Sequence, residues 1–120
     1  MPRRCARRWT AHSVEHLLLE RRHAGLEIQV ALLDGVPLGA AEIDRDGVDP
    51  ENPADPERRG RILVCPPRLA RGRVDGLERL AARAARVLGL CRGFARVDFV
   101  VDPRGNEVIL EAEPLPSLHR

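Results

Sequence analysis

The sequence predicts an α+β fold in which helices pack on an antiparallel sheet. Two pairs of segments with alternating apolar residues are each joined by a turn, as in β-hairpins. Between the two pairs, one segment repeats its apolar residues with the period of a helix. The chain has 120 residues, of which 43% are hydrophobic and 32% charged, so we expect one small domain with one core.

The N-terminal residues are basic and then become amphipathic. We expect residues 1–12 to be poorly ordered, because arginines dominate them, and the folded domain to span residues 13–120. A short helix is predicted over residues 13–22, since Ser13 is a suitable N-cap and the apolar residues that follow share one helical face.

The first hairpin has a clear turn signal. Residues 26–33 alternate apolar and polar side chains, which predicts a half-buried strand. Asp34-Gly35 predicts a type I′ turn, because both central positions of that turn need positive φ. The return strand should then run over residues 36–43.

A polar stretch rich in proline separates this hairpin from the helix. Residues 44–61 are predicted to form a long loop. A short apolar strand follows over residues 62–65 and ends at Pro66-Pro67, since proline cannot donate to a sheet.

The clearest helix is predicted over residues 75–89. Asp75 and Glu78 fit a capping box at its start, and Gly89 is a natural stop after its last turn. Its apolar residues line one face: Leu77, Leu80, Ala81, Ala84, Val87 and Leu88.

The last hairpin pairs residues 95–102 with a strand that begins at Glu107, through a turn over residues 103–106. Opposite residues of an antiparallel pair point to the same face, so the apolar residues of the two strands should oppose each other. Phe99 opposite Leu110 and Val97 opposite Ala112 meet that condition.

The same register gathers charge on the other face. It puts Asp98 opposite Glu111 and Arg96 opposite Glu113. Like charges directly opposite each other destabilise a strand pair unless a cation lies between them, and Mg²⁺ prefers such oxygen ligands. The pattern alone leaves two interpretations equally open: a magnesium site, or a solvated face on which Arg96 neutralises one acid.

Charge and composition exclude several classes of protein. The 20 basic residues, all arginine, are interleaved with 18 acids, and only three aromatic residues are present, so we expect no nucleic-acid partner. No apolar run is long enough to span a bilayer, and no secretory signal precedes the domain, so we expect no membrane partner and a cytoplasmic location. Three cysteines without metal-ligand spacing are expected to be reduced.

The closing segment carries a family resemblance. Residues 93–118 read GFARVDFVVDPRGNEVILEAEPLPSL and resemble the end of the D-alanine–D-alanine ligases, where an Arg-x-Asp strand leads through a hairpin to a Leu-Glu-x-Asn strand and a proline-containing loop. The strand and Cys-Pro segment ILVCPPRL, the helix after it, and Gly25-Leu26-Glu27 are also similar to that family. The resemblance implies an incomplete C-terminal lobe of an ATP-grasp fold, whose open sheet face forms half of an ATP cleft.

The resemblance also implies roles for the charged residues. Asp98, Glu111 and Glu113 would bind Mg²⁺, as two ions in the complete enzyme with Mn²⁺ as an alternative, and the metal would bridge the phosphates of ATP. Arg96 would be catalytic, stabilising the oxyanion formed when an amine attacks an acyl phosphate.

Nucleotide contacts are implied by the same likeness. Glu27 would accept hydrogen bonds from the ribose, and Glu20 with the backbone near His23 would face the adenine. Val100 and Leu110 would pack against the adenine ring, with ordinary sheet core as the other interpretation.

The proline-containing loop would border the substrate. Residues 114–118 would line the site for a D-amino acid such as D-alanine, with the backbone N–H of Ser117 near the oxyanion and Leu118 beside it.

Three departures from the family pattern qualify these expectations. Glu113 stands where the family has asparagine, the chain has no lysine to hold phosphates, and it starts where the second half of the nucleotide site begins. We therefore expect a fragment of a peptidoglycan-synthesis ligase that is inactive alone and needs an N-terminal lobe on a separate chain. The alternatives are a non-catalytic ATP-grasp remnant or nucleotide-binding module, and an ATP-grasp ligase with another acid or amine.

Overall fold

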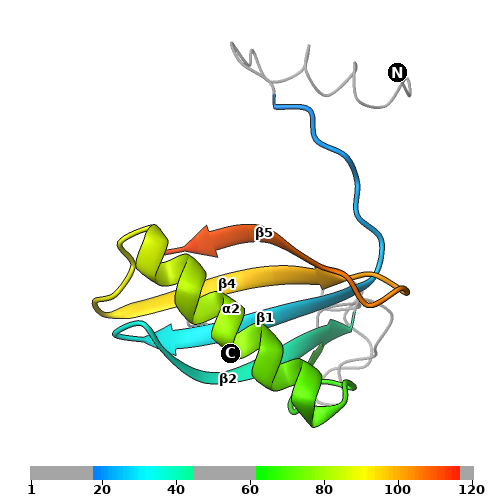
Figure 1. Cartoon of the computed structure of the whole chain (residues 1–120), viewed down its shortest axis with the longest axis horizontal. Helices are drawn as coiled ribbons and strands as arrows, with labels where there is room; N and C mark the ends of the chain where they lie inside the picture. Colours follow the sequence, from blue (N-terminus) through cyan, green and yellow to red (C-terminus); the bar gives the residue numbers. More distant parts are fainter. Residues whose placement is uncertain (1–17, 45–61, 117–120) are drawn as a thin grey trace, which may run out of the picture.

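The computed structural model describes residues 18–44 and 62–116 and confirms the α+β fold. Within these residues, five antiparallel strands form one sheet in the order β3-β2-β1-β4-β5, and one helix crosses a single face of it (Figure 1). The elements are β1 (Leu26–Leu33), β2 (Val36–Asp44), β3 (Ile62–Val64), α2 (Arg71–Val87), β4 (Phe94–Val101) and β5 (Glu107–Glu113).

The first hairpin forms as the sequence predicts. Asp34 has φ 52° and Gly35 has φ 76°, the positive values that a type I′ turn requires. The Asp34 side chain also accepts a hydrogen bond from the backbone N–H of Gly93 at 2.7 Å, and the Asp34 N–H donates to the Gly93 carbonyl at 2.9 Å. The turn is thereby tied to the loop that leads into β4.

Helix α2 begins one turn earlier than predicted, and the predicted capping box is wrong. Its N-cap is Ala70, which makes no side-chain capping bond. Asp75 instead lies inside the helix, where its Oδ1 forms an ion pair with Nε of Arg71, four residues earlier, at 2.9 Å. The end is as predicted, since Gly89 follows the C-cap with φ 73°.

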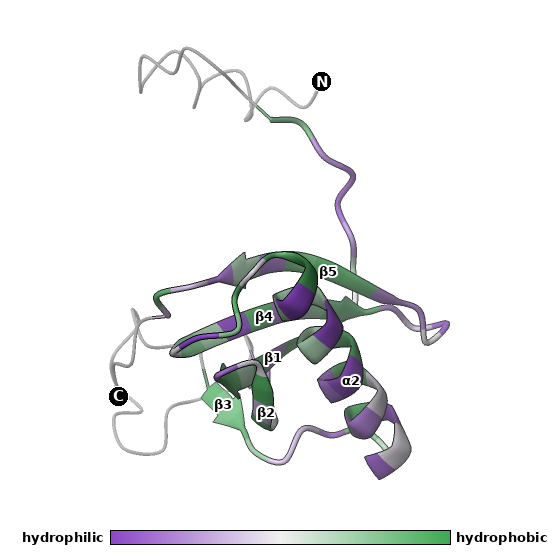
Figure 2. Ribbon diagram, turned by 60° about the vertical axis from the view of Figure 1, so that its left-hand side comes forward, coloured by the Kyte–Doolittle hydropathy of each residue, from purple (hydrophilic) through white to green (hydrophobic). Residues whose placement is uncertain are grey.

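The core lies between α2 and the sheet. Its buried side chains alternate along β1 and β4 and recur with the helical period on α2, where Figure 2 shows hydrophobic and hydrophilic residues interspersed. They include Ile28, Val30, Leu32, Val74, Leu77, Ala81, Ala85, Ala95, Val97, Phe99 and Val101. The predicted stripe is wrong at its C-terminal end, because Val87 and Leu88 are 85% and 59% exposed.

The β4–β5 hairpin follows the predicted register at only one end. Arg96, Val97 and Asp98 oppose the predicted partners, but a bulge after Asp98 puts Ile109 opposite Phe99, so the predicted Phe99–Leu110 pair is wrong. Leu110 is the extra residue of the bulge and is 52% exposed. The connection covers residues 102–106, one residue longer than expected.

Two other predicted elements lie only partly within the residues that the structure describes. The helix predicted over residues 13–22 is wrong over residues 18–22, which are not helical; residues 13–17 and the predicted loop at 45–61 lie outside the described part. Leu18 and Leu19 are 80% and 67% exposed, so a helix there has no apolar surface to pack on. In residues 18–44 and 62–116, no helix has the length and hydrophobicity needed to cross a membrane.

Candidate functional site

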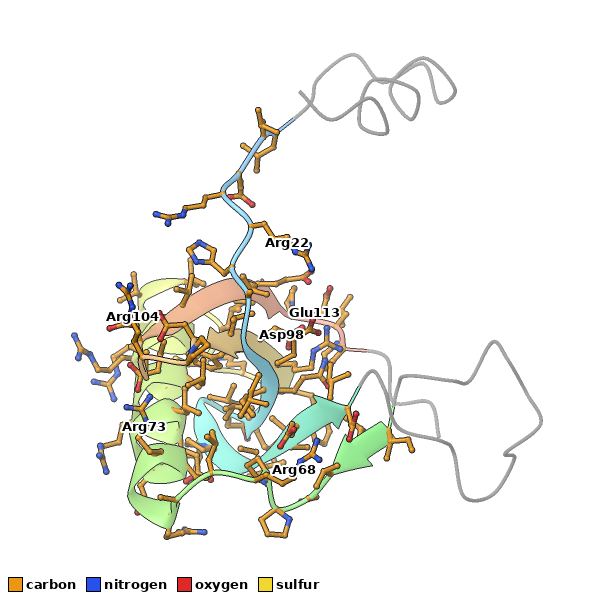
Figure 3. The ribbon with its side chains drawn as sticks, turned by 90° about the vertical axis from the view of Figure 1, so that its right-hand side faces the viewer. Arg22, Arg68, Arg73, Asp98, Arg104 and Glu113 are labelled. Carbon is orange, nitrogen blue, oxygen red and sulfur yellow. The ribbon has the colours of Figure 1, made fainter. Side chains whose placement is uncertain are left out.

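The sheet face away from α2 presents charged residues from β4 and β5. Arg96 pairs in register with Glu113, and Asp98 with Glu111, so all four side chains start from the same face. Figure 3 shows the labelled Asp98 and Glu113 on the opposite side of the sheet from the helix. We call this face the open face, and these four residues the charged strip.

Within the charged strip, Arg96 holds Asp98. Its Nε lies 2.7 Å from Oδ1 and its Nη2 lies 3.0 Å from Oδ2, a two-point contact between side chains that are 24% and 18% exposed. This contact raises the pKa of Arg96, with smaller contributions from Glu111 and Glu113. Arg96 is therefore a permanent cation among three acids.

The side chains of the three acids do not form one metal-binding group here. Among the described residues, no three His, Cys, Asp or Glu side chains lie close enough together to hold a metal ion. One oxygen of Glu113 accepts the backbone N–H of Leu115 at 3.0 Å. The register still allows Asp98 and Glu111 to meet one cation, and Mg²⁺ takes one or two carboxylates with water and phosphate oxygens as its other ligands.

Small side chains lie beside the charged strip on β1 and β2. Ala31 on β1 lies opposite Arg96, and Gly39 on β2 lies opposite Ala31. In the next row on this face, Gln29 lies opposite Asp98, and Ala41 lies opposite Gln29. A Cβ added at Gly39 would meet no atom within 4 Å. The open face therefore has free space next to its charges.

An apolar row follows, one step along the strands. This row crosses the sheet from β5 to β3 and consists of Val108, Val100, Glu27, Ile43 and Leu63. Glu27 is thus the one acid among apolar neighbours. Val100 is only 3% exposed, which agrees with the interpretation as sheet core.

The remaining predicted site residues lie elsewhere. Glu20 and His23 are exposed on an extended segment that leads away from the sheet (Figure 1). Leu110 lies at the bulge, and Ser117 and Leu118 lie outside the described residues.

Sequence reasoning missed Gln29 as a member of the site. Its Nε2 donates to Asp98 Oδ2 at 3.5 Å, because Gln29 on β1 is the register partner of Asp98 on β4. Strict alternation of apolar and polar residues in β1 indicated that Gln29 points away from the core. It gave no sign that β1 and β4 are neighbours.

A second charged cluster lies at the other edge of the sheet, on the α2 side. Glu42 is 1% exposed and accepts three hydrogen bonds from Arg68, two from the guanidinium at 3.0 and 2.6 Å and one from the backbone N–H at 3.0 Å. Arg68 also contacts Asp44 at 2.8 Å. The hydrogen bonds from Arg68 lower the pKa of Glu42, against the opposing effect of burial. We interpret this cluster as structural, because it lies on the opposite face from the charged strip.

Comparison with known proteins agrees with the fold and with the closing hairpin. A family model described as "D-ala D-ala ligase C-terminus" matches residues 6–119. The D-alanine–D-alanine ligase of Saccharophagus degradans is 34% identical over 108 residues, which cover 90% of this chain and 34% of that protein. The corresponding ligase of Gloeobacter violaceus is 39% identical over 105 residues, 85% of this chain and 34% of that protein.

A solved structure has the same fold. The Bacillus anthracis D-alanine–D-alanine ligase complexed with ATP superposes with a TM-score of 0.60 at 22% identity, over 81% of this chain and 28% of that one. The chain thus spans about a third of the length of the relatives that it matches.

Proposed function

Since the chain belongs to the D-alanine–D-alanine ligase family, we propose that it contributes the C-terminal part of an ATP-grasp active site that joins a carboxylate to an amine through an acyl phosphate. The observation that carries this proposal is the register of β4 and β5. It opposes Asp98 to Glu111 on the open face, beside Arg96.

Asp98 and Glu111 are the residues that would hold Mg²⁺. Two opposed carboxylates repel each other unless a cation neutralises them, and oxygen donors on neighbouring strands suit that ion. When bound, the metal supplies charge neutralisation for the phosphates of ATP. Glu113 faces its own backbone, which supports a two-carboxylate site rather than one with three acids.

Arg96 would be the oxyanion-stabilising residue. Its guanidinium is a permanent cation on the open face, and the small residues Ala31 and Gly39 follow it across β1 and β2 in the register. An arginine there would stabilise negative charge on an acyl phosphate and on the tetrahedral intermediate that follows amine attack. Glu27 and the partly exposed members of its row would offer one surface to the nucleoside, and the ligase of Bacillus anthracis, which shares this fold, was solved with ATP.

The proposal places the complete activity in peptidoglycan precursor synthesis in the cytoplasm, with D-alanine as the amino acid. The chain spans a third of its relatives, and two lobes are needed to exclude water from such a reaction. We therefore propose that turnover needs the remaining lobes of the family fold.

Isothermal titration with ATP in the presence of MgCl₂ tests the site. We expect binding to the full chain that is lost in Asp98→Asn and in Glu111→Gln, because either change removes a carboxylate from the metal. Glu107→Gln is the matched control: it removes the same charge from β5 but at a residue that pairs with Arg73, at 3.0 Å, on the α2 side. Equal binding by all four proteins, or binding by none, would contradict the proposal.

The second candidate is a nucleotide-binding module without turnover, favoured by the carboxylate at Glu113 and by the Arg96–Asp98 ion pair. Phosphate release measured with the complementary lobes of a relative separates the two. If Glu113→Asn gains no release over the unmodified chain, the binding module is supported.

A further inference from the structure

We propose that Glu113 is a positioning residue that receives the Arg96 guanidinium when a divalent cation takes Asp98, so that guanidinium and metal exchange at one carboxylate. This inference rests on the proposed function, and it replaces the expectation that Glu113 is itself a metal ligand.

The first step concerns Asp98, for which Arg96 and a metal ion compete. Arg96 contacts both of its carboxylate oxygens, at 2.7 and 3.0 Å, and Gln29 lies 3.5 Å from one of them. These three donors occupy most of the lone-pair sites of the carboxylate, and a divalent ion at Asp98 repels the guanidinium beside it, so metal binding favours release of Arg96. The Arg96 side chain is only 24% exposed, so its released guanidinium is stabilised if another acid lies within reach.

The second step is the choice of acceptor. Glu113 is the register partner of Arg96 across β4 and β5, and side chains of such pairs begin about 5 Å apart at Cβ. Glu111 opposes Asp98 and would be committed to the metal. Glu113 is the remaining acid of the strip, and its charge already acts favourably on the Arg96 guanidinium.

The third step is the charge balance. The strip carries one guanidinium and three carboxylates, a net charge of 1 − 3 = −2. After the exchange, the two negative charges of Asp98 and Glu111 are balanced by the divalent ion. The positive charge of Arg96 is balanced by Glu113. A neutral asparagine at position 113 would offer the released guanidinium no such partner.

The experiment follows the Arg96 side chain directly. The full chain is labelled with ¹⁵N-arginine, its Arg96 Nε–Hε resonance is assigned with Arg96→Gln, and MgCl₂ alone is added to saturation. We expect the resonance to move to a second position and to remain visible, because the guanidinium passes from one carboxylate to another. In Glu113→Gln with Mg²⁺, the resonance should broaden through exchange with water.

Affinity gives the second measurement. Glu113→Gln should weaken Mg²⁺ binding about threefold relative to the Glu107→Gln charge control, the size expected of a part-exposed ion pair. In an Arg96→Gln background this loss should largely disappear, because no guanidinium then needs an acceptor.

Three results would overturn the inference while leaving the metal site standing. They are a resonance that does not move at Mg²⁺ saturation, the same Mg²⁺-bound resonance in Glu113→Gln, and an affinity loss that is undiminished without Arg96. The last would make Glu113 a metal ligand. If Mg²⁺ alone binds none of the proteins, the exchange is overturned as well, whereas the proposed function is decided by the separate titration with ATP and MgCl₂.

Discussion

At the scale of single residues, one buried charge stands out. Among the described residues, Glu42 is the one charged side chain that is buried, and Arg68 supplies every hydrogen bond that we assign to its carboxylate. A buried charge is tolerated only when it is paired and hydrogen-bonded. The pair holds the segment after β3 against β2, which fixes one edge of the sheet.

Substitutions at this pair should be unequal in cost. We expect Glu42→Gln to lower the free energy of unfolding by about 1.5 kcal/mol, because an amide keeps part of the hydrogen bonding. Arg68→Ala should cost more, since it leaves the Glu42 carboxylate buried without a partner. Urea unfolding measures both, and a smaller loss in Arg68→Ala would contradict this view of the pair.

The same pair predicts a dependence on acid. The pKa of Glu42 lies below its ordinary value of 4.5 in the folded chain, so its contribution to stability is present above 4.5 and is lost as the pH falls through the lower folded value. The gap in unfolding free energy between the unmodified chain and Glu42→Gln should therefore close in acid. A gap that stays constant from about pH 7 to about pH 3 would show that the charge contributes nothing.

At the scale of elements, the start of β1 depends on a close backbone contact. A Cβ built on Gly25 would lie 2.1 Å from the carbonyl oxygen of Val101, at the end of β4. No side chain fits in that space, so the two strands can approach here only because residue 25 is glycine.

Gly25→Ala should therefore destabilise the domain by about 2 kcal/mol, since the clash forces backbone shifts. Gly76→Ala is the matched control: the same substitution within α2 meets no atom within 4 Å and should stabilise by about 1 kcal/mol. Thermal unfolding that moves both variants in the same direction would contradict the contact.

Helix α2 packs on the sheet through the apolar side chains of its inward face. Leu77 is fully buried against the sheet, and Leu88, just past the last turn, is 59% exposed. Leu77→Ala should cost about 3 kcal/mol, whereas Leu88→Ala should cost about 0.5 kcal/mol. Equal unfolding midpoints in denaturant for the two variants would mean that the helix does not pack as described.

At the scale of the whole molecule, ligand binding should raise stability. If Mg²⁺ and ATP bind the folded chain only, nucleotide at ten times its dissociation constant adds about 1.4 kcal/mol and raises Tm by roughly 5 °C. Differential scanning fluorimetry measures the shift, which Asp98→Asn should abolish and Glu107→Gln should keep. A shift of equal size in Asp98→Asn would move the site away from the charged strip.

The sequence predicted much of this architecture because the relevant signals are local. Alternation located β1 at its observed ends, Asp34-Gly35 gave the turn, and apolar matching gave the register of Asp98 with Glu111. The bulge at Leu110 was missed, because an extra residue breaks the alternation on which register prediction depends. The start of α2 was missed because the helix begins without a side-chain cap.

The sequence by itself determined the hairpins, the apolar side of the main helix and the acids of the last two strands, since each depends on residues close together in the chain. Only the tertiary structure decided that β1 lies beside β4, that Gln29 reaches Asp98, and that Arg68 covers Glu42. Those contacts join residues far apart in sequence. They form when α2 packs on one face of the sheet and the two hairpins come to lie side by side beneath it.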